Sequence, residues 1–134
     1  MKMEEVFASL FDREMSFRSA RLLSYEKGKI LIEAKVTEEN ANPYGFAHGG
    51  YLYTLCDSAA GLLGYSLGDY IVTQQASISY ISSAALNDTL TIEGTCIHNG
   101  RTTKVAEIAI HGQDGRLVCK ATFTLFSIRK TNDQ

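Results

Sequence analysis

The sequence has few cysteines, no long apolar run and little net charge, and each shortage argues against a class of protein. The three cysteines show neither CxxC nor zinc-like spacing, so we expect neither a disulfide framework nor a structural zinc site. No apolar run approaches the roughly 20 residues that span a bilayer, so we expect no membrane partner. The net charge of −2 lacks the cationic excess on which general DNA or RNA binding depends, so we expect no nucleic-acid partner.

The first residues also lack the features of an export signal. Glu4 and Glu5 stand where such a signal carries positive charge and then an apolar stretch, so we expect a reduced, cytoplasmic location. The length of 134 residues is typical of one domain with its own core. Because no linker, repeat or low-complexity tract interrupts the chain, we predict a single domain over residues 1–134.

Apolar periodicity divides the chain into helices and strands. Residues 4–12 carry apolar side chains at helical spacing, which predicts a short N-terminal helix. Residues 16–36 indicate a β-hairpin around Gly28, and the stretch that follows, with the only proline, indicates an ordered loop. Residues 51–67 predict a long helix with one apolar face. Four strands follow, and short turns join the last three.

This order of elements predicts the fold class α+β, with a single antiparallel β-sheet wrapped around a long central α-helix. Such a sheet leaves an outer face and a long edge to cover, and closed symmetric assemblies are the common solution. We therefore expect a homo-oligomer, which is at least a dimer and extends to a tetramer of two dimers.

The strongest chemical signal lies at the start of the long helix. His48, Gly49 and Gly50 precede or open that helix, where the first N–H groups have no intrahelical partner and the macrodipole is positive. Because glycine lets a substrate approach the backbone, the Gly49 N–H is a candidate donor to a substrate carbonyl. The alternative is a plain loop-to-helix turn.

Asp57 lies about two turns further along the helix. It stands beside Tyr53, Gly61 and Gly64 instead of the charged residues of a solvated face, so a closely packed neighbour is the better explanation than an ordinary surface acid. At about 1.5 Å of rise per residue, Asp57 lies roughly 12 Å from Gly49 along the axis, too far for both to act on one carbonyl. If both are catalytic, they come from different subunits of a symmetric dimer.

The spacing of these residues resembles a known family. The pattern N-P-x-G-x-x-H-G-G, followed after six residues by Asp57 and small residues, resembles the PaaI-like and acyl-CoA thioesterase 13-like branch of the hotdog thioesterases. The resemblance runs from Asn42 to the C-terminal strand and includes the segments ISYISSA and NGRTT. It implies a hotdog fold and hydrolysis of an acyl- or aryl-acyl-CoA thioester to free acid and CoA, with no cofactor beyond the CoA of the substrate.

The resemblance also implies catalytic roles. Asp57 matches the carboxylate that acts as general base on water or as nucleophile, and Gly49 matches the residue whose backbone N–H polarises the carbonyl. Asn42 matches an amide that orients the substrate or the water, and Thr73 falls where the family has a hydroxyl near the carboxylate. An ordinary β-branched strand residue is an equally good interpretation of Thr73.

The histidines are given no chemical step. Histidine is a common general base, but the resemblance implies that His48 is mainly structural, with a ring that hydrogen-bonds within the loop. We place His48 and Gly50 among the residues that bind the substrate. His98 and His111 lack metal-like clustering, so we expect no metal.

CoA carries phosphates, so cationic residues are expected near the mouth of the site. The candidates for substrate binding are Arg101, Thr102 and Lys104 in one hairpin turn, with Ser82 and Ser83 bordering the same channel. A solvated hairpin tip with no ligand is an equally good interpretation of the turn.

The identity of the acyl group stays open. Ser83 stands where the family commonly has proline, and Gln74 and Gln75 stand where it has a more apolar strand, so the chain length of the substrate is not predicted.

Two other functions stay open as well. A hotdog hydratase or dehydratase would combine a histidine with a carboxylate in a proline-rich approach to the helix, and this chain has one proline. A non-catalytic acyl-CoA-binding module would keep the glycine pair but would not need Asp57, whose presence favours the enzyme.

Overall fold

Alternating apolar and polar residues build the strands of the sheet. The computed structural model describes residues 2–11 and 19–131. In β2 (Lys29–Lys35), Ile30, Ile32 and Ala34 are buried and the residues between them are not, and β5 (Thr103–His111) alternates in the same way along its whole length. The elements are α1 (Met3–Phe11), β1 (Arg21–Glu26), β2 (Lys29–Lys35), a short 3-10 helix (Glu38–Asn40), α2 (Gly49–Ser66), β3 (Asp69–Tyr80), β4 (Thr89–Asn99), β5 (Thr103–His111) and β6 (Leu117–Lys130).

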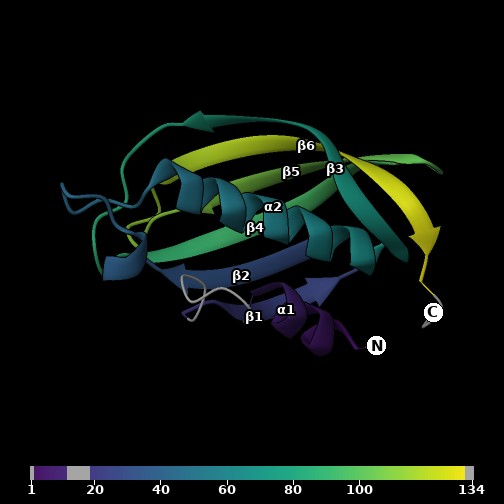
Figure 1. Ribbon diagram of the computed structural model, residues 1–134, viewed down its shortest axis with the longest axis horizontal. Coiled ribbons are helices and arrows are strands. Elements are labelled where there is room, and N and C mark those ends of the chain that lie inside the picture. The colour runs from purple at the N-terminus through teal and green to yellow at the C-terminus, as the bar shows by residue number, and fades with distance from the viewer. Residues whose placement is uncertain (1, 12–18, 132–134) are drawn as a thin grey trace.

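The strands form one antiparallel sheet in the order β1-β2-β4-β5-β6-β3. The strands β4, β5 and β6 follow one another along the chain and pair as neighbours, whereas β3 leaves α2 and pairs with β6 at the far edge. The sheet curves around α2, as Figure 1 shows. The two edges of the sheet are therefore β1 and β3.

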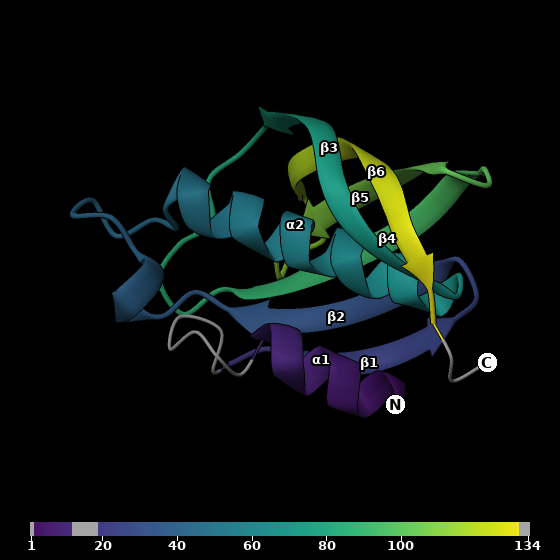
Figure 2. The ribbon, with the colours of Figure 1, turned by 45° about the vertical axis from the view of Figure 1, so that its right-hand side comes forward.

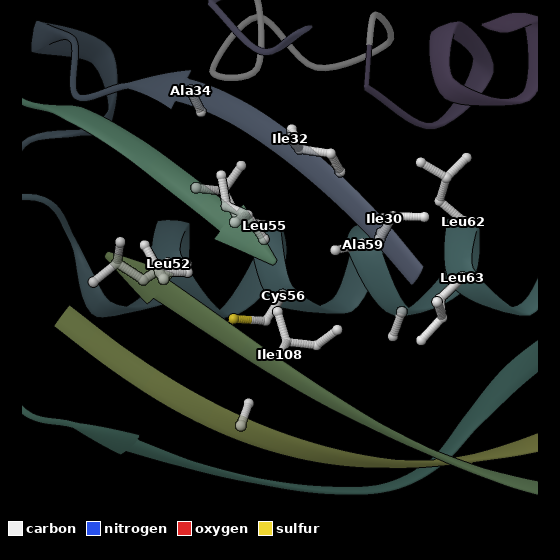
Figure 3. Packing of buried hydrophobic residues seen from close by; sticks show 14 of the residues in the cluster. Ile30, Ile32, Ala34, Leu52, Leu55, Cys56, Ala59, Leu62, Leu63 and Ile108 are labelled. Carbon is white, nitrogen blue, oxygen red and sulfur yellow. The ribbon is translucent and has the colours of Figure 1, made fainter. Parts of the chain in front are cut away.

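The core lies between α2 and the concave face of the sheet. Leu55, Ala59 and Leu62 of α2 are fully buried, and Figure 3 shows them pointing toward the side chains of β2. Gly64 faces β3, where an added Cβ would lie 2.5 Å from a side-chain carbon of Ile71. Only glycine permits this close approach of helix and strand, so the closely packed neighbour expected beside Gly64 is a strand of the same chain.

The N-terminal helix α1 packs against α2 near the β1 edge of the sheet (Figure 2). Phe7 and Phe11 stack with ring centroids 4.6 Å apart, and both are buried. Leu10 approaches Gly61 of α2, where an added Cβ would lie 3.9 Å from it. The burial of this apolar face explains why so short a helix is stable in the protein.

The predicted fold class, an α+β hotdog fold, is confirmed. The long helix and the four strands after it occur in the predicted order, and Gly28 connects the predicted hairpin with a φ of +79° that suits glycine. The predicted N-terminal helix ended at Asp12 and the predicted hairpin began at Ser16, and both of these residues lie outside the described part. The sequence did not predict the position of β3 at the sheet edge, because that position depends on long-range pairing.

Candidate active site

The loop before α2 is ordered by Asn42. The Asn42 side-chain oxygen accepts hydrogen bonds from the backbone N–H groups of Tyr44 at 2.9 Å and Phe46 at 3.1 Å. The N–H of Ala47 then donates to the carbonyl of Ala84 at 2.8 Å, which fixes the loop against the segment after β3. Asn42 therefore holds the turn through its oxygen, and its amide N–H groups have no acceptor within the described chain.

Gly49 is the first residue of α2, and His48 is the N-cap with φ −60° and ψ 139°. The backbone N–H of His48 donates to the carbonyl of Asn40 at 2.9 Å. The exposed His48 ring makes no hydrogen bond to any described residue, so the expected ring contact within the loop is not present. The Gly49 N–H also lacks an acceptor among residues 2–11 and 19–131. It can donate to a bound oxygen at the positive end of the helix.

A groove of about 380 Å³ opens beside Gly49. Its walls come from the first turn of α2, from Tyr80 at the end of β3, and from the segment 81–84. The groove therefore brings the predicted residues Ser82 and Ser83 next to Gly49. The Ser82 hydroxyl donates to the carbonyl of Leu117 at 2.7 Å, so this side chain also anchors the segment to β6.

Asp57 meets Thr73 across the interface of α2 and β3. The Thr73 hydroxyl donates to one carboxylate oxygen of Asp57 at 2.7 Å. Asp57 is half-buried, and in the described chain this hydroxyl is its one hydrogen-bond donor. The carboxylate is thus oriented by one partner and keeps a second oxygen that can accept a proton from a bound water.

The neighbouring Cys56 does not offer an alternative nucleophile. Its hydrogen bond with the Cys119 thiol and its burial raise the pKa of Cys56 well above the usual value. Because the thiolate is the reactive form, this thiol is inert, and the carboxylate of Asp57 is the better candidate for chemistry.

Lys104 does not lie exposed at the hairpin tip as the sequence suggested. Its ammonium group is buried and lies 2.8 Å from a carboxylate oxygen of Asp69. It also donates to the Asn99 side chain at 2.6 Å and to the Gly100 carbonyl at 2.7 Å. Two of its three N–H donors form these hydrogen bonds, and the ion pair with Asp69 is its third polar contact. The assignment of Lys104 to substrate binding is therefore corrected to a structural role.

The rest of that turn lies far from Gly49. Arg101 and Thr102 are exposed, and the Thr102 carbonyl accepts a hydrogen bond from the N–H of Ser127 at 2.8 Å. The turn lies beside the start of β3, whereas Gly49 lies beside its end, and Figure 1 shows the two at opposite ends of α2. A helix of 18 residues is roughly 27 Å long, so these candidates do not converge within one chain.

Tyr80 is a groove residue to which the sequence analysis gave no role. Its hydroxyl donates to the Gly49 carbonyl at 2.8 Å, and its side chain is half-exposed. The only signal for Tyr80 in the sequence is its place in the segment ISYISSA, which does not reveal that the strand ends against the helix.

Neither a membrane-spanning helix nor a metal site is present in the part of the chain that the structure describes. None of its helices is long and apolar enough to cross a membrane. Within residues 2–11 and 19–131, no group of three or more His, Cys, Asp or Glu side chains could hold a metal ion.

Comparison with known proteins gives consistent matches. A family model described as the Thioesterase superfamily matches residues 44–119. The chain is 31% identical over 106 residues to acyl-coenzyme A thioesterase 13 of Homo sapiens, which covers 77% of this chain and 76% of that protein.

Two solved structures are similar over most of the chain. A hypothetical thioesterase protein from Streptococcus pneumoniae TIGR4, with coenzyme A, has a TM-score of 0.91 and 42% identity over 96% of this chain and 98% of its own. A protein from Streptococcus mutans UA159 bound to acetyl CoA has a TM-score of 0.84 and 46% identity over 87% of this chain and 94% of its own.

Two variants of the Streptococcus pneumoniae protein have also been solved, one with an aspartate and one with a threonine replaced by alanine. The two substituted positions are 16 residues apart, which is the spacing of Asp57 and Thr73. Because the family model covers more than half of the sequence, the chain belongs to the thioesterase superfamily.

Proposed function

We propose that this protein hydrolyses acyl-CoA thioesters to the free acid and CoA. The observation that carries the proposal is the unpaired Gly49 N–H, which lies at the positive end of α2 beside an open groove. Membership of the thioesterase superfamily and the similarity to structures with coenzyme A and acetyl CoA support the choice of substrate.

The thioester carbonyl oxygen accepts a hydrogen bond from the Gly49 N–H, which stabilises the oxyanion that develops as the carbonyl is attacked. The acyl group lies in the groove against Leu52 and Ile81. His48 and Gly50 border the substrate at the helix start, and Ser82 and Ser83 line the same groove. Oxyanion donors of this kind contribute factors of roughly 10²–10³ in kcat.

Asp57 activates the attacking group. As general base, it takes a proton from water while the water oxygen bonds to the carbonyl carbon, and the intermediate then expels the CoA thiolate, which is protonated to the thiol. As nucleophile, Asp57 itself bonds to the carbonyl carbon, and the C–S bond breaks to release the CoA thiolate, which is protonated to the thiol; water then hydrolyses the resulting anhydride to the free acid and restores the Asp57 carboxylate. Both routes give the same products. In either route Thr73 orients the carboxylate, and the free amide N–H groups of Asn42 orient the substrate or the water.

The site is shared between two subunits. Asp57 and Gly49 lie about 12 Å apart along one helix, so the carbonyl held by Gly49 meets the Asp57 of a second copy. The same arrangement brings Arg101 and Thr102, which lie at the far end of α2 in one subunit, toward the groove of the second subunit. There the guanidinium of Arg101 pairs with CoA phosphates.

The edge strand β3 is the surface through which two copies join. Its outer edge has no strand partner in the described chain, and it carries Thr73 together with the exposed side chains of Val72 and Tyr80. Pairing through this edge covers the unpaired backbone N–H and C=O groups of an edge strand, which would otherwise favour aggregation, and it forms a dimer. Two such dimers form the tetramer.

A panel of acyl- and aryl-CoA substrates with a thiol reagent tests the function. We expect release of free CoA that scales with enzyme concentration. Binding without release would favour the non-catalytic acyl-CoA-binding module instead. Water addition to an enoyl-CoA without CoA release would favour the hydratase.

Subunit mixing tests the shared site. Asp57→Ala and Gly49→Pro each remove one catalytic group, and the backbone of His48 already has the extended conformation that a following proline requires. Random reassociation makes half of the dimers mixed, each with one intact site, so about a quarter of the activity returns. No recovery after proven exchange between folded variants would place both groups in one subunit.

A monomeric mass by sedimentation at micromolar concentration would exclude the shared site altogether.

A further inference from the structure

Tyr80 makes two separate contacts with Gly49. Its hydroxyl donates to the Gly49 carbonyl oxygen at 2.8 Å. Its ring covers the face of Gly49 on which a side chain would stand, because an added Cβ would lie 3.3 Å from the ring carbon Cζ. The same ring is one wall of the groove. Tyr80 thus contacts both the backbone of the candidate oxyanion donor and the space where the acyl group binds.

The first turn of α2 has few contacts of its own that would restrain its backbone. Gly49 and Gly50 are consecutive glycines. Glycine has more backbone freedom than other residue types, so each lowers helix stability by about 0.5–1 kcal/mol relative to alanine. An added Cβ at Gly50 would meet nothing within 4 Å, so no packing restrains that residue. The His48 side chain makes no capping hydrogen bond to the helix. The first turn is therefore held by contacts from outside the helix.

The hydroxyl of Tyr80 is suited to that task. A carbonyl oxygen has two lone pairs, so Gly49 can accept from Tyr80 as well as from the helix. Tyr80 is fixed in turn by its place in β3, where it pairs with Cys119 of β6. This ties the helix N-terminus to the sheet, and it holds the peptide groups on both sides of Gly49 in one orientation.

We infer that Tyr80 is a positioning residue of the thioesterase site, which holds the Gly49 backbone in the orientation that stabilises the oxyanion and closes one side of the acyl groove. The inference rests on the proposed function. It separates two parts of one side chain: the hydroxyl acts on the chemical step through Gly49, and the ring acts on acyl binding.

Two substitutions separate these parts. Tyr80→Phe keeps the ring and removes the hydroxyl, so we expect kcat to fall roughly threefold to tenfold with KM within about twofold of wild type, because one hydrogen bond is lost in positioning. Tyr80→Leu also removes the ring, so we expect the same loss in kcat together with a rise in KM of several fold. Tyr25→Phe is the matched control, because the Tyr25 hydroxyl bonds to Glu4 at 3.1 Å, far from the groove. It should leave both constants unchanged.

The kinetic constants are measured with the best acyl-CoA of the panel, and Tm is measured for each variant. The expected result is a lower kcat for Tyr80→Phe at unchanged KM and with Tm close to that of Tyr25→Phe. A wild-type kcat in Tyr80→Phe, or a loss matched by a rise in KM alone, would overturn the inference while leaving the thioesterase proposal intact. A wild-type protein that hydrolyses no acyl-CoA would overturn both.

Discussion

Asp57 and Asp69 lie in neighbouring elements, yet their surroundings are opposite. Asp69, at the start of β3, has no exposed side-chain surface and pairs with Lys104 at 2.8 Å and Lys130 at 2.7 Å, and Ser127 donates to it at 2.9 Å. Burial alone would favour the protonated form of Asp69, but the hydrogen bonds from Lys104, Lys130 and Ser127 hold the pKa of this carboxyl below its usual value. Asp57, in α2, is half-buried and is held by one hydroxyl.

The difference separates a structural charge from a reactive one. A buried carboxylate that is paired with cations and a hydroxyl is not accessible to a substrate. Removing one of its partners destabilises the fold. A carboxylate with one neutral partner keeps a free oxygen that can take up a proton. The two aspartates should therefore respond to the same substitution in opposite ways.

The largest effect is expected at the reactive carboxylate. Asp57→Asn removes the group that accepts the proton or forms the bond, so kcat should fall by roughly 10²–10⁴. The unfolding midpoint should hardly change, because no buried cation loses its partner. Steady-state hydrolysis and urea denaturation of the same preparation measure both. A variant with near-wild-type kcat would show that Asp57 is not catalytic.

Asp69→Asn should show the reverse pattern. It leaves the buried Lys104 without its anionic partner, and breaking such a pair costs about 3–5 kcal/mol of unfolding free energy. The kcat of the folded fraction should stay within a few fold of wild type. Lys130→Ala is the control, because this lysine is 65% exposed and exposed pairs contribute at most about 1 kcal/mol. Equal stability of Asp69→Asn and Lys130→Ala would contradict the assignment.

The pH dependence of stability sharpens the same contrast. Because the folded state lowers the pKa of Asp69 below its ordinary value of 3.8, the stabilisation is fully present above that value and is lost as the pH falls through the folded pKa. The difference in unfolding free energy between wild type and Asp69→Asn should therefore be constant from pH 7 to about pH 5. It should narrow below pH 3.8. A difference that stays constant down to pH 2 would show that the charge on Asp69 is not its source.

The smallest effects are expected from the two hydroxyls that donate to these carboxylates. Thr73→Val should lower kcat about threefold to tenfold with little change in stability, because it removes the hydrogen bond that orients Asp57. Ser127→Ala should lower the unfolding free energy by about 1 kcal/mol with little change in kcat, because it removes a donor to Asp69. If both variants changed the same quantity, the distinction between the two regions would fail.

Much of the fold followed from local pattern. Apolar residues at helical spacing placed α2, and alternation placed the strands, because both patterns reflect one buried face. Gly28 marked its turn because few other residues adopt its positive φ. The position of β3 next to β6 could not be predicted in this way, because alternation shows that a strand has a buried face but does not identify the strand beside it.

The candidate site shows the same division. The sequence by itself predicted that Gly49 lies at or just before the start of a helix and that Asp57 lies about two turns along it, since helix geometry is set by local hydrogen bonds. Only the tertiary structure decided which charges face solvent. The sequence predicted Lys104 to be an exposed turn residue. In the structure, β5 pairs with β6, and the start of β3 lies close enough for Lys104 to contact the buried Asp69. The contact of Tyr80 with Gly49 was decided in the same way, because it joins the end of an edge strand to the start of a helix, and only the packing of the sheet around α2 brings these two ends together.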